Sequence, residues 1–369
     1  MNVAIIGSGY IARFHARAVR AAGDRVTRIV SRTTASAQTL AEELKPLHGP
    51  VAAGEDLREI LRDDALDAVI LAQPNAFHEP HGTACLQAGK HILVEKPLAP
   101  TREEAQRLVD RAASAGRVLL TGHMWRWDPE TQWLREQIAR GALGRVVRTE
   151  GYGIHEKWGP AGWFTDPALA GGGALVDMGV HAIDTARYLL GDPLPLSVYA
   201  RVRTSFGDYA VDDDAHLVIE WDSGACSVIQ SGWWQPKAPG PEAATRLWGT
   251  GGYGSLFPTG VEPAGVDLAG VPRPDHAGKI APEGLPAKAE HCDQLIYDAQ
   301  YREFARRVAG ADRVAEVRPA AGAGPAARSP SKGGGFLDEA DREPGLVAVT
   351  IVEAAYEASR SGAVVDLRH

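Results

Sequence analysis

The sequence has few cysteines and none of the cysteine spacings that bind metals. Its 369 residues include three, Cys85, Cys226 and Cys292, which are far apart and odd in number. Such a distribution is typical of reduced thiols inside a cell, and no C-x-x-C pair suggests a structural metal site. We therefore expect a cytoplasmic protein with no disulfide framework and no bound metal.

Long apolar runs and an excess of positive charge are also missing. No apolar stretch reaches the length needed to span a bilayer, and the opening residues, MNVAIIGSGY, lack the basic segment and cleavage site of a secretion signal. The formal net charge is -8, so neither nucleic acid nor an anionic membrane would attract the chain. We expect small-molecule partners, with no nucleic acid and no membrane.

The first third of the chain alternates short apolar runs with helical patterns. Parallel strands that helices cover on both faces have this continuous apolar character, so the pattern predicts an α/β Rossmann dinucleotide-binding domain over residues 1–122. The expected strands are 3–7, 26–30, 66–72, 91–95 and 118–122, and the expected helices are 10–22, 34–45, 56–62, 80–88 and 101–115.

A chain of this length suggests a second domain, which we expect over residues 123–369. Long strand-like runs joined by turn residues predict an α+β domain with a large open antiparallel sheet. Residues 318–345, rich in Gly, Pro, Ala and Ser, predict a flexible insertion or a lid. The expected strands are 145–154, 196–206, 214–222 and 224–233, and the expected helices are 129–141, 171–190, 293–309 and 345–360.

A glycine motif follows the first strand directly and leads into a helix. In such a motif the first glycine permits a tight turn, the second lets a pyrophosphate approach the backbone, and a small third residue lets helix and strand pack closely. After the first strand of an alternating domain it predicts a dinucleotide site. Its residues are Gly7, Ser8, Gly9, Tyr10, Ile11 and Ala12.

The end of the second strand bears on the choice of dinucleotide. A carboxylate there would bind the ribose 2′-hydroxyl of NAD, but the sequence reads Ser31-Arg32-Thr33. A hydroxyl and an arginine suit a 2′-phosphate, so NADP(H) is favoured and NAD(H) stays possible. The alternative is that Arg32 is an ordinary surface arginine.

A second group of chemically active residues lies in GGGALVDMGVHAIDTARYLLG, residues 171–191. With α-helical spacing, Asp177, His181 and Asp184 share one face. A carboxylate beside an imidazole raises its basicity, as a general base requires. A surface Asp–His pair or a metal site are the alternatives, although nothing nearby in the sequence completes a metal shell.

Four segments resemble the Gfo/Idh/MocA family of glucose–fructose oxidoreductases and inositol dehydrogenases. They occur in the family's order and spacing, and the resemblance covers about residues 1–310 and the final helix. The segments are GSGYIA, PNAFHEPHGTACLQAGKHILVEKPLA, GHMWRWD and GGGALVDMGVHAID.

This resemblance implies an NAD(P)-dependent oxidoreductase that transfers hydride between nicotinamide and a carbon of a sugar, sugar derivative or cyclitol. It places Lys96 beside the nicotinamide and the substrate hydroxyl, where it orients and polarises the oxygen. Pro97 resembles the family's cis-proline, and Glu95 would tether Lys96. His181, supported by Asp177, would take the hydroxyl proton.

The resemblance also assigns further contacts, each with a structural alternative. Cofactor contacts would come from a loop after the third strand and from the segment that follows the first domain. Sugar contacts would come from HEKWGPAGWF, residues 155–164, whose donors and flat apolar faces suit sugars. The expected cofactor contacts are Gln73, Pro74, Asn75, His78, Arg126 and Trp163, and the expected substrate contacts are His123, His155, Lys157 and Trp158.

Two other functions occur on this fold. Some relatives are glycosidases that transiently oxidise a sugar with a tightly held NAD, and others are dinucleotide-binding sensors without catalysis. The presence of Lys96, Asp177 and His181 counts against a sensor. The open sheet needs covering, so we expect a homodimer or homotetramer.

Overall fold

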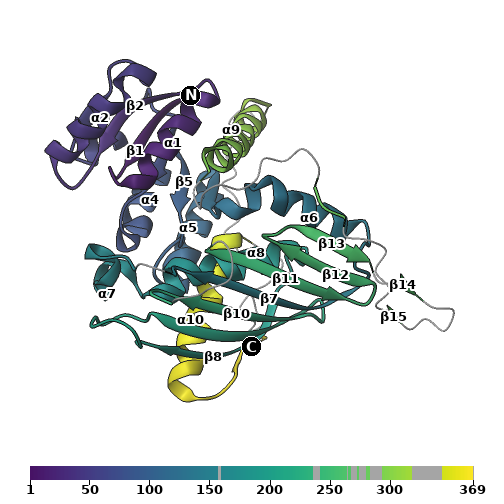
Figure 1. Ribbon diagram of the computed structural model, residues 1–369. Coiled ribbons are helices and arrows are strands. Elements are labelled where there is room, and N and C mark those ends of the chain that lie inside the picture. Colours follow the sequence, from purple (N-terminus) through teal and green to yellow (C-terminus); the bar gives the residue numbers. More distant parts are fainter. Residues whose placement is uncertain are drawn as a thin grey trace. The chain divides into compact units, whose positions relative to one another are not determined.

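The computed structural model describes residues 1–156, 159–235, 242–263, 265–266, 272–273, 280–282, 293–317 and 343–368. They form two compact units, each with its own sheet (Figure 1). The first unit comprises residues 1–124 and a segment that begins at Gln294, and the second comprises residues 125–293 and the C-terminal segment. None of the described helices has the length and apolar character to cross a membrane.

The first unit contains the predicted parallel sheet, with strand order β3-β2-β1-β4-β5-β6. Its central strands β1 and β4 are almost wholly buried, which explains their continuous apolar sequences. The short strand β3 was not predicted from the sequence. The strands are β1 (Asn2–Ile6), β2 (Arg25–Val30), β3 (Ala52–Gly54), β4 (Ala68–Leu71), β5 (His91–Glu95) and β6 (Leu119–Gly122).

Helices of the first unit begin within two residues of the predicted starts. Helix α5 has a full capping box, in which Thr101 and Glu104 each bond to the other's backbone N–H. Helix α9 (Gln294–Val317) packs against α1 and buries Tyr297, Tyr301 and Phe304. The other helices are α1 (Tyr10–Ala21), α2 (Thr34–His48), α3 (Arg58–Leu61), η1 (Asn75–Phe77), α4 (His78–Gln87) and α5 (Arg102–Ala115).

The second unit is built on an eight-stranded sheet with strand order β13-β12-β11-β7-β10-β9-β8-β16. All neighbouring strands are antiparallel except β7 and β10, which run parallel. This confirms a large, mainly antiparallel sheet, but the parallel β7–β10 pair was not expected, and β11, β12, β13 and β16 were not predicted. The strands are β7 (Val146–Ile154), β8 (Pro195–Arg203), β9 (Asp214–Trp221), β10 (Cys226–Gly232), β11 (Ala243–Gly249), β12 (Gly252–Leu256), β13 (Gly260–Pro263) and β16 (Val365–Asp366).

Helices α6, α8 and α10 pack on this sheet (Figure 1). Strand β9 alternates strictly: its inward residues, such as Leu217 and Trp221, join the core with Ile183 and Ile351, whereas Val218 is exposed on the other face. The helical elements are η2 (Met124–Trp127), α6 (Pro129–Ala139), η3 (Gly162–Thr165), α7 (Pro167–Ala170), η4 (Leu175–Gly179), α8 (Val180–Leu189) and α10 (Pro344–Ser361). The described chain also includes the short strands β14 (Gly265–Val266) and β15 (Pro272–Arg273).

The expected insertion at 318–345 extends too far at its end, because α10 already begins at Pro344 with Glu343 as its N-cap. The remainder of that stretch, residues 318–342, lies outside the described residues, as do Lys157, Trp158 and Cys292.

Candidate active site

The turn between β1 and α1 has the geometry that a pyrophosphate requires. Gly7 has φ +109°, and a Cβ there would lie 2.1 Å from the Ala72 carbonyl oxygen, so only glycine fits. No side chain caps the first turn of α1, which leaves its backbone N–H groups available to an anion. Ala12 is fully buried against the sheet. The residues present therefore fit a dinucleotide.

A group of hydroxyls surrounds the end of β2. The Ser31 hydroxyl lies 2.8 Å from that of Ser8 and accepts a hydrogen bond from that of Ser36 at 3.0 Å. Thr33 caps α2 by accepting the N–H of Ser36. Arg32 is exposed, and no ion pair joins it to another residue that the structure describes. The guanidinium of Arg32 is therefore available to a ligand.

The loop after β4 is fixed by a buried histidine. The ring nitrogens of His78 lie 2.8 Å from the Pro97 carbonyl oxygen and 3.0 Å from that of Gln73. Burial lowers the pKa of His78, although its contacts with the Pro97 and Gln73 carbonyl oxygens act in the opposite direction. This supports the structural alternative for His78: it joins the Gln73 loop, which continues through Pro74 into Asn75, to the segment that carries Lys96.

Glu95 and Lys96 end strand β5, and the bond between Lys96 and Pro97 is cis, as the resemblance implied. Glu95 Oε1 lies 2.7 Å from Nε2 of the fully buried His15 in α1, and Glu95 also accepts the N–H of Lys96 at 3.2 Å. Burial alone would raise the pKa of Glu95, but His15 and Lys96 lower it below its ordinary value. The carboxylate therefore fixes the strand end from which Lys96 projects.

In the second unit, Asp177 lies in a π-helical turn, η4, that precedes α8. A π-turn has more residues than an α-turn and is common at functional sites. It breaks the α-helical spacing from which we placed Asp177, His181 and Asp184 on one face. His181 is buried in α8, and Asp184 bonds to Arg126.

Asp177 lies beside buried groups from two other parts of the second unit. Its Oδ2 accepts the indole N–H of Trp233 at 3.1 Å and lies 3.5 Å from Nε2 of His155. The other ring nitrogen of His155 lies 2.7 Å from Oε1 of Glu242. Burial would lower the pKa of His155, but Asp177 and Glu242 raise it above its ordinary value.

A second aspartate holds the start of the π-turn. The carboxylate of Asp212 accepts the N–H groups of Gly173 and Leu175, each at 2.8 Å, and the hydroxyl of Tyr356 at 2.5 Å. A Cβ on Gly173 would lie 1.9 Å from the Asp212 carbonyl oxygen. The backbone that leads to Asp177 thus depends on a glycine and a buried carboxylate.

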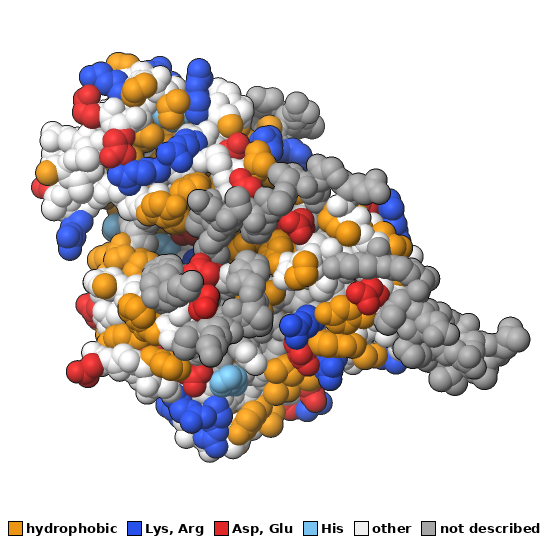
Figure 2. All heavy atoms as spheres, in the orientation of Figure 1, with side chains coloured by type: hydrophobic (Ala, Val, Ile, Leu, Met, Phe, Trp, Pro, Cys, Tyr) orange, Lys and Arg blue, Asp and Glu red, His pale blue; other side chains and the backbone are white. Residues whose placement is uncertain are grey.

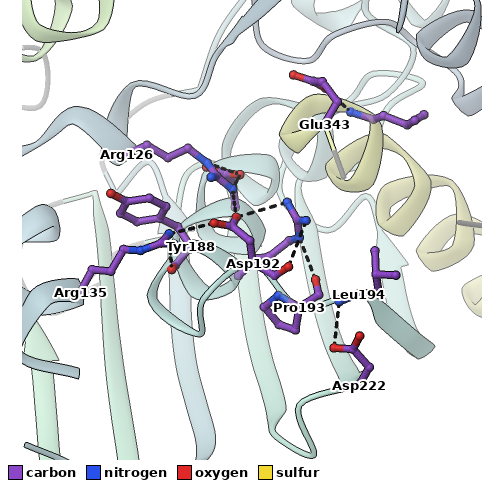
Figure 3. Close-up of polar contacts among 11 residues, drawn as sticks. Arg126, Arg135, Tyr188, Asp192, Pro193, Leu194, Asp222 and Glu343 are labelled. Atoms are coloured by element: carbon purple, nitrogen blue, oxygen red, sulfur yellow. Dashed lines mark hydrogen bonds and ion pairs between the residues drawn. The ribbon is translucent and has the colours of Figure 1, made fainter. Parts of the chain in front are cut away.

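Arg126 belongs to a buried charge network (Figure 3). It bonds to Asp184 through Nε and Nη2 and to Asp192 at 2.7 Å, and Arg135 bonds to Asp192 at 2.8 Å. Burial would lower the pKa of Arg126, but Asp184 and Asp192 raise it above its ordinary value. The ring of Tyr188 packs against both arginines. The charge of Arg126, an expected cofactor contact, is therefore balanced within the second unit.

The other expected contacts have varied surroundings. His123 is buried, and Trp163 stacks on Phe164 with ring centroids 3.9 Å apart. Sequence reasoning missed His15, Asp212 and Glu242, since no local pattern shows which distant residues they would contact.

The fold and the phosphate turn define a dinucleotide-binding oxidoreductase architecture, with strand order 3-2-1-4-5-6 and an open helix N-terminus after β1. Residues 1–123 match the oxidoreductase family with an NAD-binding Rossmann fold (Gfo/Idh/MocA), and residues 131–254 match the Gfo/Idh/MocA C-terminal domain. The chain belongs to the Gfo/Idh/MocA family.

Several characterised proteins are similar to the chain. D-glucoside 3-dehydrogenase of Escherichia coli (strain K12) is 35% identical over 63% of this chain and 65% of its own length, just under two thirds of that protein. The NADP(+)-dependent scyllo-inositol 2-dehydrogenase of Bacillus subtilis (strain 168) is 27% identical over 89% of this chain and 86% of its own. The structure of a levoglucosan dehydrogenase, solved with NADH and levoglucosan, aligns with this chain over the full length of both proteins. The TM-score is 0.80 and the identity is 22%, which shows the fold.

Proposed function

We propose that the chain is a cytoplasmic NAD(P)-dependent dehydrogenase acting on a hydroxyl of a sugar, sugar derivative or cyclitol, or on the corresponding ketone. The observation that carries this proposal is that the segments bearing Lys96 and Asp177 are each held in place by buried partners. Lys96 follows a carboxylate that His15 holds, and Asp177 lies in a π-turn beside buried donors. The similar proteins named above are sugar and cyclitol dehydrogenases.

Each site residue has a defined part in this proposal. A bound dinucleotide would supply the hydride acceptor at its nicotinamide. Lys96, a cation, would donate to the substrate oxygen and favour loss of its proton. His181 would accept that proton, and Asp177 would stabilise the charge that His181 acquires. The N–H groups of α1 would hold the pyrophosphate.

We further propose that NADP(H) is preferred. Three hydroxyls and the exposed Arg32 lie at the end of β2, where the 2′-position of the adenosine ribose is read in such folds. Among the similar proteins, one is named for NADP(+) and another was solved with NADH, so both cofactors occur in the family.

We also propose that the chain forms a homodimer or homotetramer through the outer face of the eight-stranded sheet. This face carries Val218 and the edge-to-face pair of Trp248 and Tyr253, with Arg148 over the ring of Trp248. On the face shown in Figure 2, hydrophobic, basic and acidic side chains are interspersed over the described residues.

The test is a spectroscopic assay for reduced nicotinamide with NADP and with NAD, across sugars, glycosides and cyclitols. We expect turnover with one substrate class, which Lys96→Met reduces by about a thousandfold while dinucleotide affinity stays within about threefold. His181→Ala should change the pH–rate profile as well as the rate. Near-wild-type turnover of Lys96→Met, or silence across the panel with the cofactor bound, would overturn the proposal.

A further inference from the structure

Glu242 and His155 face each other because of the way two strands pair. His155 directly follows β7, and Glu242 directly precedes β11, the antiparallel neighbour of β7. The Ile154 N–H donates to the Glu242 carbonyl oxygen at 2.8 Å, which holds the end of β7 beside the start of β11. The backbone ladder thus places the Glu242 carboxylate against the imidazole of His155.

The imidazole of His155 is bracketed by two carboxylates. Nδ1 is 2.7 Å from Glu242, Nε2 is 3.5 Å from Asp177, and the ring is 4% exposed. A neutral imidazole has one N–H and could serve only one of these acceptors, whereas an imidazolium serves both. In this setting the charged ring is the form that satisfies its neighbours, and both carboxylates favour it.

The charge on His155 matters to Asp177, whose side chain is 10% exposed. A buried carboxylate costs free energy unless donors and opposite charge surround it. Asp177 receives the indole N–H of Trp233 and the Nε2–H of a protonated His155. Neutral His155, with its single proton shared toward Glu242, would leave Asp177 with one donor fewer and with its charge unopposed by the ring.

Backbone groups and an amide side chain also lie around His155. On the β10 side, its backbone N–H donates to the Gly232 carbonyl oxygen and its own carbonyl oxygen accepts from Gln235. The side chain of Gln235 bonds to Asp214, whose carboxylate also pairs with the exposed His216. Asp177 and Glu242 both pair with the ring of His155.

We propose that Glu242 is a positioning residue which, by holding His155 as an imidazolium, keeps Asp177 ionised and fixed for the proton transfer of the dehydrogenase reaction. This role rests on the function proposed above. Glu242 needs no contact with substrate or cofactor, because it acts through His155.

The variant Glu242→Gln distinguishes an effect of the Glu242 charge from a purely structural hydrogen bond to His155. Glutamine keeps an oxygen that can accept the Nδ1–H of His155, so a purely structural contact survives while the charge is lost. Glu357→Gln is the matched control, since Glu357 is exposed on α10 and the change in charge is the same. Glu242→Asp restores the charge.

The first measurement is an NMR titration of the histidine ring carbons in the whole chain, which needs no turnover. We expect His155 to titrate about one pH unit lower or more in Glu242→Gln than in the wild type, and to be unchanged in Glu357→Gln. The second is kcat/KM against pH. Glu242→Gln should lose about tenfold at pH 8 and recover toward wild type near pH 6, with partial rescue by Glu242→Asp.

An unchanged titration of His155, or a loss of activity that is equal at all pH values, would overturn the proposal. If the wild type turned over no sugar or cyclitol, the proposed function would fail. The titration would still decide whether Glu242 sets the charge of His155.

Discussion

Arg126 and Asp184 form a two-point ion pair, with Nε and Nη2 of the arginine each 2.8 Å from a carboxylate oxygen. The side chains are 10% and 2% exposed, and Asp184 lies in α8, one turn beyond His181. The pair therefore fixes the position of α8 relative to η2 within the second unit. Geometry of this kind is what arginine, and not lysine, provides.

Arg126→Met should destabilise the protein strongly. Removal of the guanidinium leaves the buried carboxylate of Asp184 and the partly exposed carboxylate of Asp192 without their shared cation, which costs about 3 kcal/mol or more. Urea unfolding should show this loss in the transition of the second unit. Arg140→Met removes the exposed partner of Glu136 and should unfold close to the wild type. Similar losses for both variants would contradict the assignment.

Gly173→Ala should disrupt the approach to the π-turn. The new methyl group would overlap the Asp212 carbonyl oxygen, a backbone atom that cannot move independently of its strand connection. We expect a loss of about 2 kcal/mol or more in stability and at least a tenfold loss in kcat. Gly310→Ala, in the helix α9 with nothing within 4 Å of the position its methyl group would take, should be neutral or stabilising. Thermal unfolding and turnover of both variants provide the check, and equal behaviour would count against the close contact.

The Glu95 carboxylate should contribute stability that depends on pH with a definite sign. Its pKa is lowered in the folded protein, so the contribution is present above the unfolded-state pKa and disappears as the pH falls through the folded-state pKa. Each unit of lowering corresponds to about 1.4 kcal/mol. The difference in unfolding free energy between wild type and Glu95→Gln should be constant near neutrality and shrink below about pH 4. Glu103→Gln, whose side chain is 87% exposed, should show no such trend.

Arg32→Ala should change cofactor choice more than catalysis. Loss of a charge-assisted contact to a 2′-phosphate should raise the KM for NADP by about tenfold or more and leave the KM for NAD within about twofold. Arg111→Ala, on the exposed face of α5, is the matched control for general charge. Equal KM changes for the two cofactors would show that Arg32 is an ordinary surface residue.

Much of the fold could be predicted because local patterns determine it. Continuous apolar runs indicate parallel strands buried on both faces, and strict alternation in β9 indicates a sheet with one open face. The three-residue strand β3 was missed, since so short a segment has no measurable period. The phosphate turn was predicted because Gly7 and Gly9 lie close together in the sequence, directly after the first strand.

The site was only partly predictable. Asp177 and His181 stand out through their spacing, but a π-turn leaves no clear mark in one sequence, so the predicted common face with Asp184 was not reliable. Side-chain contacts between residues far apart in the sequence could not be predicted. His15 meets Glu95 across 80 positions, and His155 meets Glu242 across 87, and nothing local to either residue indicates the pairing.

The position of α9 has a consequence for how the chain is made. Tyr297 and Phe14 pack ring against ring, and Gln294 donates to the Phe14 carbonyl oxygen, so α9 completes the flank of the first unit along α1. A ribosome must first synthesise all of residues 125–293, which takes on the order of ten seconds or more. Throughout that interval the nascent dinucleotide-binding unit exposes an apolar flank, and a chaperone that covers α1 would protect it until the last segment emerges.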